Sequence, residues 1–95
     1  MKISEIKEGM TNVSLEAKIV EKGERRSVRT KYGRRDVANL LLEDETGNIL
    51  LTLWGEMIDE FDVGDKVKIS GAFVTEFKDE LYINVPRRSG KIEKI

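Results

Sequence analysis

The sequence predicts an all-β domain in which five antiparallel strands curl into a small barrel, with one short helix between the third and fourth strands. Apolar residues alternate with polar ones over short stretches, which is typical of strands with one buried face. Turns rich in glycine and acidic residues separate these stretches. The connections are too short for the helical crossovers that join parallel strands.

The length of 95 residues predicts a single domain over residues 1–95, with one modest core. The longest apolar runs are only a few residues, far short of a membrane span. The N-terminal stretch 1–8 also lacks the apolar region of a signal peptide. We therefore expect a cytoplasmic protein that has no membrane partner.

The first elements are a helical turn and a strand. Residues 3–9 suit a single helical turn, with Ser4 as its cap and Gly9 at its end. Strict alternation follows over residues 13–20. It predicts a half-buried strand whose inward side chains are Val13, Leu15, Ala17 and Ile19.

Residues 23–35 (GERRSVRTKYGRR) hold six Lys/Arg and one Glu, a net charge of +5. Their near-alternating polar character, with a hairpin tip at 31–33, predicts a protruding β-arm. Residues 36–85, by contrast, carry a net charge of −9, so the total of −1 conceals the local basic charge. The near-neutral total therefore does not argue against a polyanionic partner.

The next two strands enclose an acidic turn over residues 44–48. Residues 37–43 alternate, with burial expected near the Leu40–Leu42 end. In the strand over 48–55, the inward set Ile49, Leu51 and Leu53 leaves Trp54 on the opposite face. Residues 56–61 then suit a short helix with Met57, Ile58 and Phe61 turned inward.

The fourth strand changes phase at Gly71. Val67 and Ile69 point inward before it, and an isolated glycine within a strand often marks a bulge. A bulge turns Phe73, Thr75 and Phe77 outward. A hairpin over 78–80 leads to the fifth strand, where Tyr82 and Asn84 alternate with inward residues, and 91–95 adds a last short strand. A sheet this small must curl to cover its inner face, which gives an OB-like barrel.

Trp54 is the only tryptophan, and an exposed aromatic platform on a sheet suits the face of a nucleic-acid base. The chain has no cysteine and no histidine, which removes thiolate nucleophiles, the usual zinc ligands and the commonest general base. Adjacent acids such as Asp59 and Glu60 point apart, and no second ligand cluster accompanies them. We expect no catalytic residue, no metal and no cofactor.

Several short motifs occur together in one order along nearly the whole chain, and each alone is weak. In this order the chain resembles the OB fold of archaeal single-stranded DNA-binding proteins and of archaeal replication protein A repeats. The motifs are Lys7-Glu8-Gly9-Met10, Arg29-Thr30-Lys31-Tyr32-Gly33, Asp44-Glu45-Thr46-Gly47, Leu51-Thr52-Leu53-Trp54, Val63-Gly64-Asp65 and Phe77-Lys78.

The resemblance implies sequence-tolerant binding of single-stranded DNA in replication, recombination or repair. By position, Trp54, Phe73 and Phe77 match the stacking residues of that family, and the strand-clamping arm is matched by Arg26, Val28, Thr30 and Lys31. Two departures are Asp79, where a glycine is usual, and 86–88, which replace a more glycine-rich stretch. Strand alternation adds Tyr82 as a fourth platform.

The expected contacts to the nucleic-acid backbone are cationic or hydroxyl side chains, since phosphate neutralisation explains a concentration of six cations in the arm. They are Arg25, Arg26, Arg29, Thr30, Lys31, Arg34, Arg35, Lys66 and Lys68. We expect a monomer that binds single-stranded DNA and, further, replication or repair proteins. A domain that binds single-stranded RNA or tRNA, and a protein-interaction subunit that docks a partner on the Trp54 face, stay open as alternatives.

Overall fold

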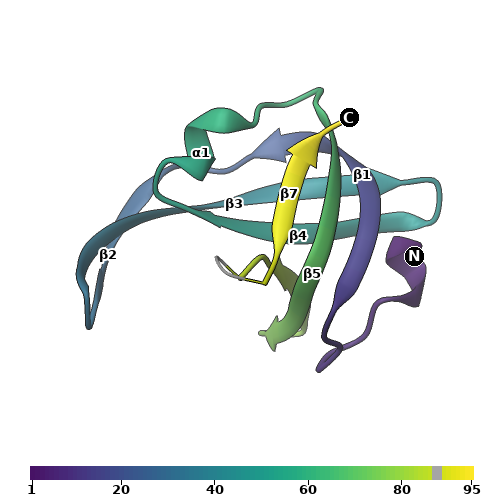
Figure 1. Cartoon of the computed structure of the whole chain (residues 1–95), viewed down its shortest axis with the longest axis horizontal. Helices are drawn as coiled ribbons and strands as arrows, with labels where there is room; N and C mark the ends of the chain where they lie inside the picture. The colour runs from purple at the N-terminus through teal and green to yellow at the C-terminus, as the bar shows by residue number, and fades with distance from the viewer. Residues whose placement is uncertain (87–88) are drawn as a thin grey trace.

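The computed structural model describes residues 1–86 and 89–95; Arg87 and Arg88, which belong to the second departure, lie outside the described residues. Strands dominate these described residues, which also form one 3-10 turn and one short helix (Figure 1). No helix in the described part is long and apolar enough to cross a membrane. The elements are η1 (Ile3–Glu5), β1 (Val13–Lys22), β2 (Arg26–Thr30), β3 (Gly33–Asp44), β4 (Gly47–Trp54), α1 (Met57–Glu60), β5 (Lys66–Phe77), β6 (Glu80–Asn84) and β7 (Lys91–Lys94).

The five predicted strands are β1, β3, β4, β5 and β6, and their pairings form a closed ring in the order β1-β3-β4-β6-β5. The short helix α1 lies between β4 and β5, as predicted. A closed ring with an odd number of strands cannot be antiparallel throughout, and here the β4–β6 pairing is the parallel one. The arm, β2 with the first part of β3, extends away from this ring (Figure 1), while β7 adds to the outer edge of β5.

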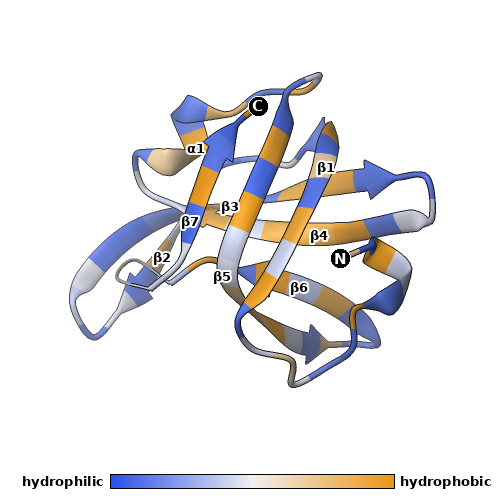
Figure 2. Cartoon of the chain, turned by 45° about the vertical axis from the view of Figure 1, so that its right-hand side comes forward, coloured by the Kyte–Doolittle hydropathy of each residue, from blue (hydrophilic) through white to orange (hydrophobic). Residues whose placement is uncertain are grey.

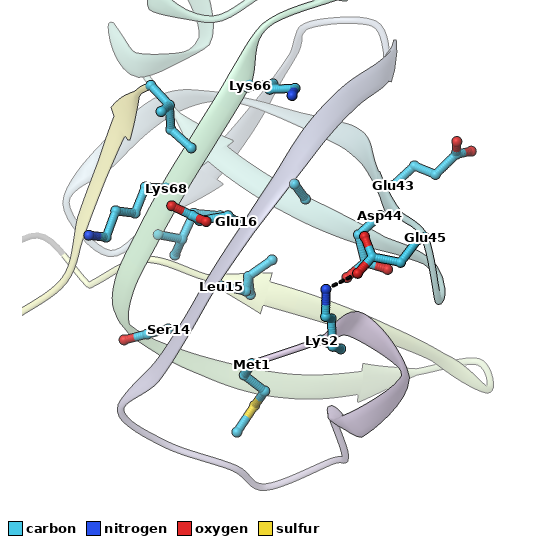
Figure 3. A pocket seen from close by; sticks show the side chains of 13 residues that line it. Met1, Lys2, Ser14, Leu15, Glu16, Glu43, Asp44, Glu45, Lys66 and Lys68 are labelled. Atoms are coloured by element: carbon cyan, nitrogen blue, oxygen red, sulfur yellow. Dashed lines mark ion pairs between the residues drawn. The ribbon is translucent and has the colours of Figure 1, made fainter.

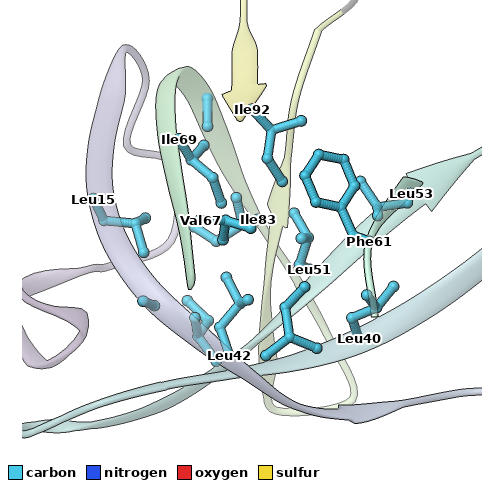
Figure 4. Packing of buried hydrophobic residues seen from close by; sticks show 14 of the residues in the cluster. Leu15, Leu40, Leu42, Leu51, Leu53, Phe61, Val67, Ile69, Ile83 and Ile92 are labelled. Atoms are coloured by element: carbon cyan, nitrogen blue, oxygen red, sulfur yellow. The ribbon is translucent and has the colours of Figure 1, made fainter. Parts of the chain in front are cut away.

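The hydrophobic core fills the inside of the ring. Each strand contributes alternate residues, and the predicted inward sets of β1 and β4 are all buried. Figure 2 shows the resulting alternation of hydrophobic and hydrophilic residues along β1 and β5. From α1 and its end, Ile58 and Phe61 are buried as predicted, and Figure 4 shows Phe61 beside Leu53.

The predicted bulge at Gly71 is confirmed. Between β1 and β5, Val13 pairs with Ala72 but Leu15 pairs with Ile69, so three steps on β5 face two on β1. Gly71 takes the left-handed φ of +67° that a bulge of this kind favours. The extra residue turns Ala72 into the core and leaves Phe73 on the outer surface.

The N-terminal helical turn is shorter than predicted, and the prediction of Ser4 as its cap was wrong. The 3-10 turn spans only Ile3–Glu5, with Ser4 inside it. The Lys2 amide donates to the Glu5 carboxylate at 2.7 Å, and the Ile3 amide donates to Asp44 Oδ2 at 2.8 Å. The acceptor for Ile3 thus comes from the last residue of β3, which local sequence does not reveal.

The hairpin between β5 and β6 closes through two residues, Lys78 and Asp79, with φ of 51° and 66°. A two-residue type I′ loop requires positive φ at both positions. The third residue of the predicted hairpin, Glu80, already belongs to β6. Asp79 therefore occupies a left-handed position, which accounts for the glycine that is usual there and which aspartate also tolerates.

Candidate nucleic-acid interface

Trp54 ends β4 on the outer side of the ring, where 40% of its surface is exposed. Its partner on β3 is Val37, which is buried although it lies outside the core cluster. Paired residues share a sheet face, so Val37 and Trp54 form one apolar end of the outer face. Gly55 follows with a φ of 59° and ends the strand.

Phe73 lies on the same outer face, with 37% of its surface exposed. It pairs with Asn84 of β6, and Asn84 pairs with Thr52 of β4, two residues before Trp54. Two strand spacings and a two-residue offset place the Cα atoms of Trp54 and Phe73 about 12 Å apart. The structure thus places Trp54 and Phe73 on one face, and the outward direction of both was predicted from the alternation of their strands.

A polar row that the sequence analysis missed lies in register with Phe73 and passes two residues from Trp54 along β4. Asn39, Thr52 and Asn84 occupy neighbouring strands in register. Thr52 Oγ1 donates to Asn39 Oδ1 at 3.1 Å, and Asn84 Nδ2 donates to Thr75 Oγ1 at 3.0 Å. Amides and hydroxyls at outward strand positions can also bond base edges. The available signal was their outward phase in the predicted strands.

Phe77 and Tyr82 lie further along the outer face from Trp54. Tyr82 is half-buried and pairs with Thr75 of β5 and Leu50 of β4. Phe77 is 62% exposed beside the β5–β6 loop, with Lys78 Nζ at 5.4 Å from its ring centroid. The carboxylates nearby along the hairpin are Glu76, Asp79 and Glu80. The Phe77 end of the face is therefore acidic, whereas the Trp54 end adjoins the basic arm.

The arm divides its cations between two faces. In its register Arg26 pairs with Val37, Val28 with Arg35, and Arg29 with Arg34. Successive residues of a strand alternate in side, so Arg26 and Arg35 share the face of Val37 and Trp54. Arg29 and Arg34 lie on the reverse face, directly opposite each other.

The tip of the arm is a two-residue loop formed by Lys31 and Tyr32. Lys31 Nζ lies 5.2 Å from the centroid of the exposed Tyr32 ring. The Thr30 hydroxyl donates to the Gly33 carbonyl at 2.8 Å and accepts from the Tyr32 amide at 3.2 Å. The predicted backbone contact Thr30 thus already serves to close the loop, while the Lys31 ammonium is exposed.

A pocket of about 420 Å³ adjoins Trp54 at the base of the arm. Its wall combines the indole of Trp54 with apolar side chains and with arm residues. An aromatic wall beside cations suits a base and its phosphate. The lining residues are Arg34, Arg35, Asp36, Thr52, Leu53, Trp54, Gly55, Glu56, Met57 and Val85.

Arg25 is held by carboxylates at the base of the arm. Its Nη2 donates to Asp59 Oδ2 at 2.8 Å and to the Gly55 carbonyl at 3.3 Å, and its Nε lies 3.3 Å from Asp36 Oδ2. The hydrogen bond to Asp59 raises the pKa of the Arg25 guanidinium above its usual value. The predicted phosphate contact is therefore already occupied by two carboxylates.

The structure does not bring Lys66 and Lys68 to the aromatics. They lie on the first half of β5, which pairs with β1 and β7; Lys68 faces Glu16 and Glu93 across these pairings. Both lysines line a separate, mixed-charge pocket of about 670 Å³ near Glu43–Glu45 and the N-terminus (Figure 3). Phe73 follows the bulge, on the half of β5 that pairs with β6.

The described residues contain no group of three or more acidic side chains placed to hold a metal ion. The outer face carries aromatic, polar and cationic side chains.

The closed five-stranded ring with a helix after its third strand is an OB fold, and solved structures confirm this class. The second OB-fold domain of replication protein A from Methanococcus maripaludis superposes with a TM-score of 0.79 at 30% identity, covering all of this chain and 93% of that one. A chain of a replication protein A heterotrimer bound to single-stranded DNA shares the fold, with a TM-score of 0.77 at 20% identity over 24% of its length and all of this chain.

The sequence comparisons define the family. Residues 6–94 match the family described as single-stranded DNA binding protein Ssb-like, OB fold. The chain is 35% identical over 83 residues to the single-stranded DNA binding protein Ssb of Saccharolobus solfataricus, covering 87% of this chain and 56% of that protein. The chain belongs to the Ssb-like OB-fold family, and it spans little more than half the length of this relative.

Proposed function

We propose that this chain binds single-stranded DNA with little sequence preference, along the outer face from the arm past Trp54 to Phe73. The observation that supports this most is the position of two exposed aromatics on one face, beside an arm of net charge +5. Every base has a π-face, so stacking on Trp54 and Phe73 tolerates any sequence. The family membership supports the same ligand.

The two kinds of contact contribute differently. Stacking of one base on an aromatic ring contributes roughly 1–3 kcal/mol and changes little with salt. Arg26, Arg35 and Lys31 neutralise phosphates, so this part of the affinity falls as salt rises. Among the described residues, the acidic Phe77 end has no comparable cation apart from Lys78, so we expect the phosphate contacts to be concentrated at the arm end.

The test is a fluorescence titration of Trp54 with an oligo-dT of about 12 nucleotides, within the range that one OB fold covers. Because Trp54 is the only tryptophan, quenching reports this site alone. We expect strong quenching at low salt that weakens as salt rises. Absence of quenching at low salt would instead favour a protein-interaction module, which docks a partner on this face.

Two variants and one competitor sharpen the test. Phe73→Ala should weaken binding roughly 5- to 150-fold, the loss of one stacked base. Tyr82→Phe is the matched control, because it keeps the ring and removes only a hydroxyl at the margin of the face. A matched RNA oligomer should compete no better than DNA; a tenfold or greater preference for RNA would overturn the choice of DNA. Roles in replication, recombination or repair follow from the same ligand.

A further inference from the structure

Arg25 differs from the other cations of the arm in what it contacts. Among the described residues it is the only one of the six Lys/Arg in 23–35 that forms an ion pair, and it forms two. Its partners come from three places in the chain: Asp36 in β3, Gly55 just after Trp54, and Asp59 in α1. One guanidinium thus joins the start of the arm to the end of β4.

A second contact reinforces the same junction. The Gly55 amide donates to the Asp36 carbonyl at 2.9 Å, so Gly55 is bonded on one side by the arm backbone and on the other by Arg25. Gly55 directly follows Trp54 and has left-handed φ. These hydrogen bonds therefore couple the position of the base of the arm to the Trp54–Gly55 peptide.

We propose that Arg25 is a positioning residue: its bridge from Asp59 to Gly55 and Asp36 sets the arm beside the Trp54 face. The inference rests on the proposed function, because its value lies in aligning cations with the stacking face. Outside this bridge the arm is a two-stranded ribbon, since β3 is the one described strand with which β2 pairs. An isolated ribbon of this kind is only marginally ordered, so a tie at its base affects its orientation.

Electrostatics and positioning predict opposite signs for one substitution. Asp59→Asn removes a negative charge, so attraction of phosphate alone predicts tighter binding. Loss of the bridge instead predicts weaker binding, because the arm is no longer held beside Trp54. The matched control is Glu60→Gln on the same helix, which makes the same charge change at an exposed residue that has no ion pair among the described residues.

The experiment compares oligo-dT binding of wild type, Asp59→Asn, Glu60→Gln and Arg25→Ala over a range of salt. We expect Asp59→Asn and Arg25→Ala to weaken binding about two- to fivefold with little change in the salt slope. Glu60→Gln should bind as wild type or slightly tighter. The proposal is overturned if Asp59→Asn tightens binding, or if Arg25→Ala lowers the salt slope by about 0.7, as loss of one phosphate contact does.

A measurement without DNA separates this inference from the proposed function. Quenching of Trp54 fluorescence by acrylamide reports the solvent accessibility of the indole. We expect Asp59→Asn and Arg25→Ala to increase this quenching and Glu60→Gln to leave it unchanged; equal quenching in all four proteins overturns the bridge. Failure of the wild type to bind oligo-dT would refute the proposed function, whereas the acrylamide result, which needs no DNA, would still test the bridge.

Discussion

The division of the arm into two faces leads to the sharpest prediction. Arg26 and Arg35 share the face of Trp54, whereas Arg29 and Arg34 lie on the reverse face. Arg34 also lines the pocket beside Trp54, so the comparison is between R26A and R29A, which remove the same charge from the same strand, β2. We expect R26A to weaken oligo-dT binding more than R29A does.

The magnitude follows from phosphate neutralisation. Each contact to a single strand adds about 0.7 to the slope of log K against log salt, so losing Arg26 lowers that slope by about 0.7. Between about 50 and 200 mM salt, wild type should then lose roughly threefold more affinity than R26A. The assay is the Trp54 fluorescence titration at several salt concentrations.

The control for this comparison is R29A, whose salt slope should stay close to that of wild type. Equal reductions in both variants would refute the reasoning, because the arm would then act as a diffuse charge rather than through one face. Thermal unfolding of both proteins checks that the ribbon is retained. Removing Arg29, which directly faces Arg34, should not destabilise the ribbon, since like charges facing each other repel.

Three further substitutions test other parts of the structure. Gly71→Ala should lower the free energy of unfolding in urea by more than about 2 kcal/mol, because the position has left-handed φ and a Cβ would overlap the Ser89 carbonyl oxygen; near-wild-type stability would contradict the bulge. Asp79→Asn should strengthen oligo-dT binding about twofold by removing a carboxylate beside Phe77, with stability unchanged because asparagine also tolerates left-handed φ; unchanged or weaker affinity would place the strand away from this hairpin. Burial raises the pKa of Asp44, but hydrogen bonds from the Thr46 hydroxyl and from the Ile3, Thr46 and Gly47 amides outweigh it and lower that pKa from 3.8 to about 2. The stability from Asp44 is therefore present above about pH 4 and lost as pH falls toward 2. The free energy of unfolding of Asp44→Asn should be lower than that of wild type at pH 7, and the two values should converge near pH 2. A difference that is the same at both pH values would refute this assignment.

The local sequence pattern was enough to predict the main strands, the bulge at Gly71 and the outward direction of Trp54 and Phe73. Alternation along β4 exposes Trp54, and one glycine within β5 predicts the phase change that exposes Phe73. These inferences need only near neighbours, because a strand has a period of two. The parallel β4–β6 pairing was missed because it follows from closure of the whole ring.

The parts of the site that local sequence does not reveal depend on contacts that are distant in sequence. Lys66 and Lys68 have the expected outward phase, but the partners of β5 decide which side of the ring they face. Arg25 was grouped with the other cations because Asp59, its partner, lies 34 residues away. Similarly, alternation assigns arm residues to faces only once the register of β2 against β3 is known.

The central claim is that single-stranded DNA crosses the outer face from Trp54 to Phe73. The most direct measurement is the set of nuclear Overhauser effects between base protons of bound oligo-dT and protein rings. The account predicts contacts from bases to both the Trp54 indole and the Phe73 ring. Base contacts confined to the side of the ring that carries Lys66 and Lys68, with neither aromatic involved, would contradict it.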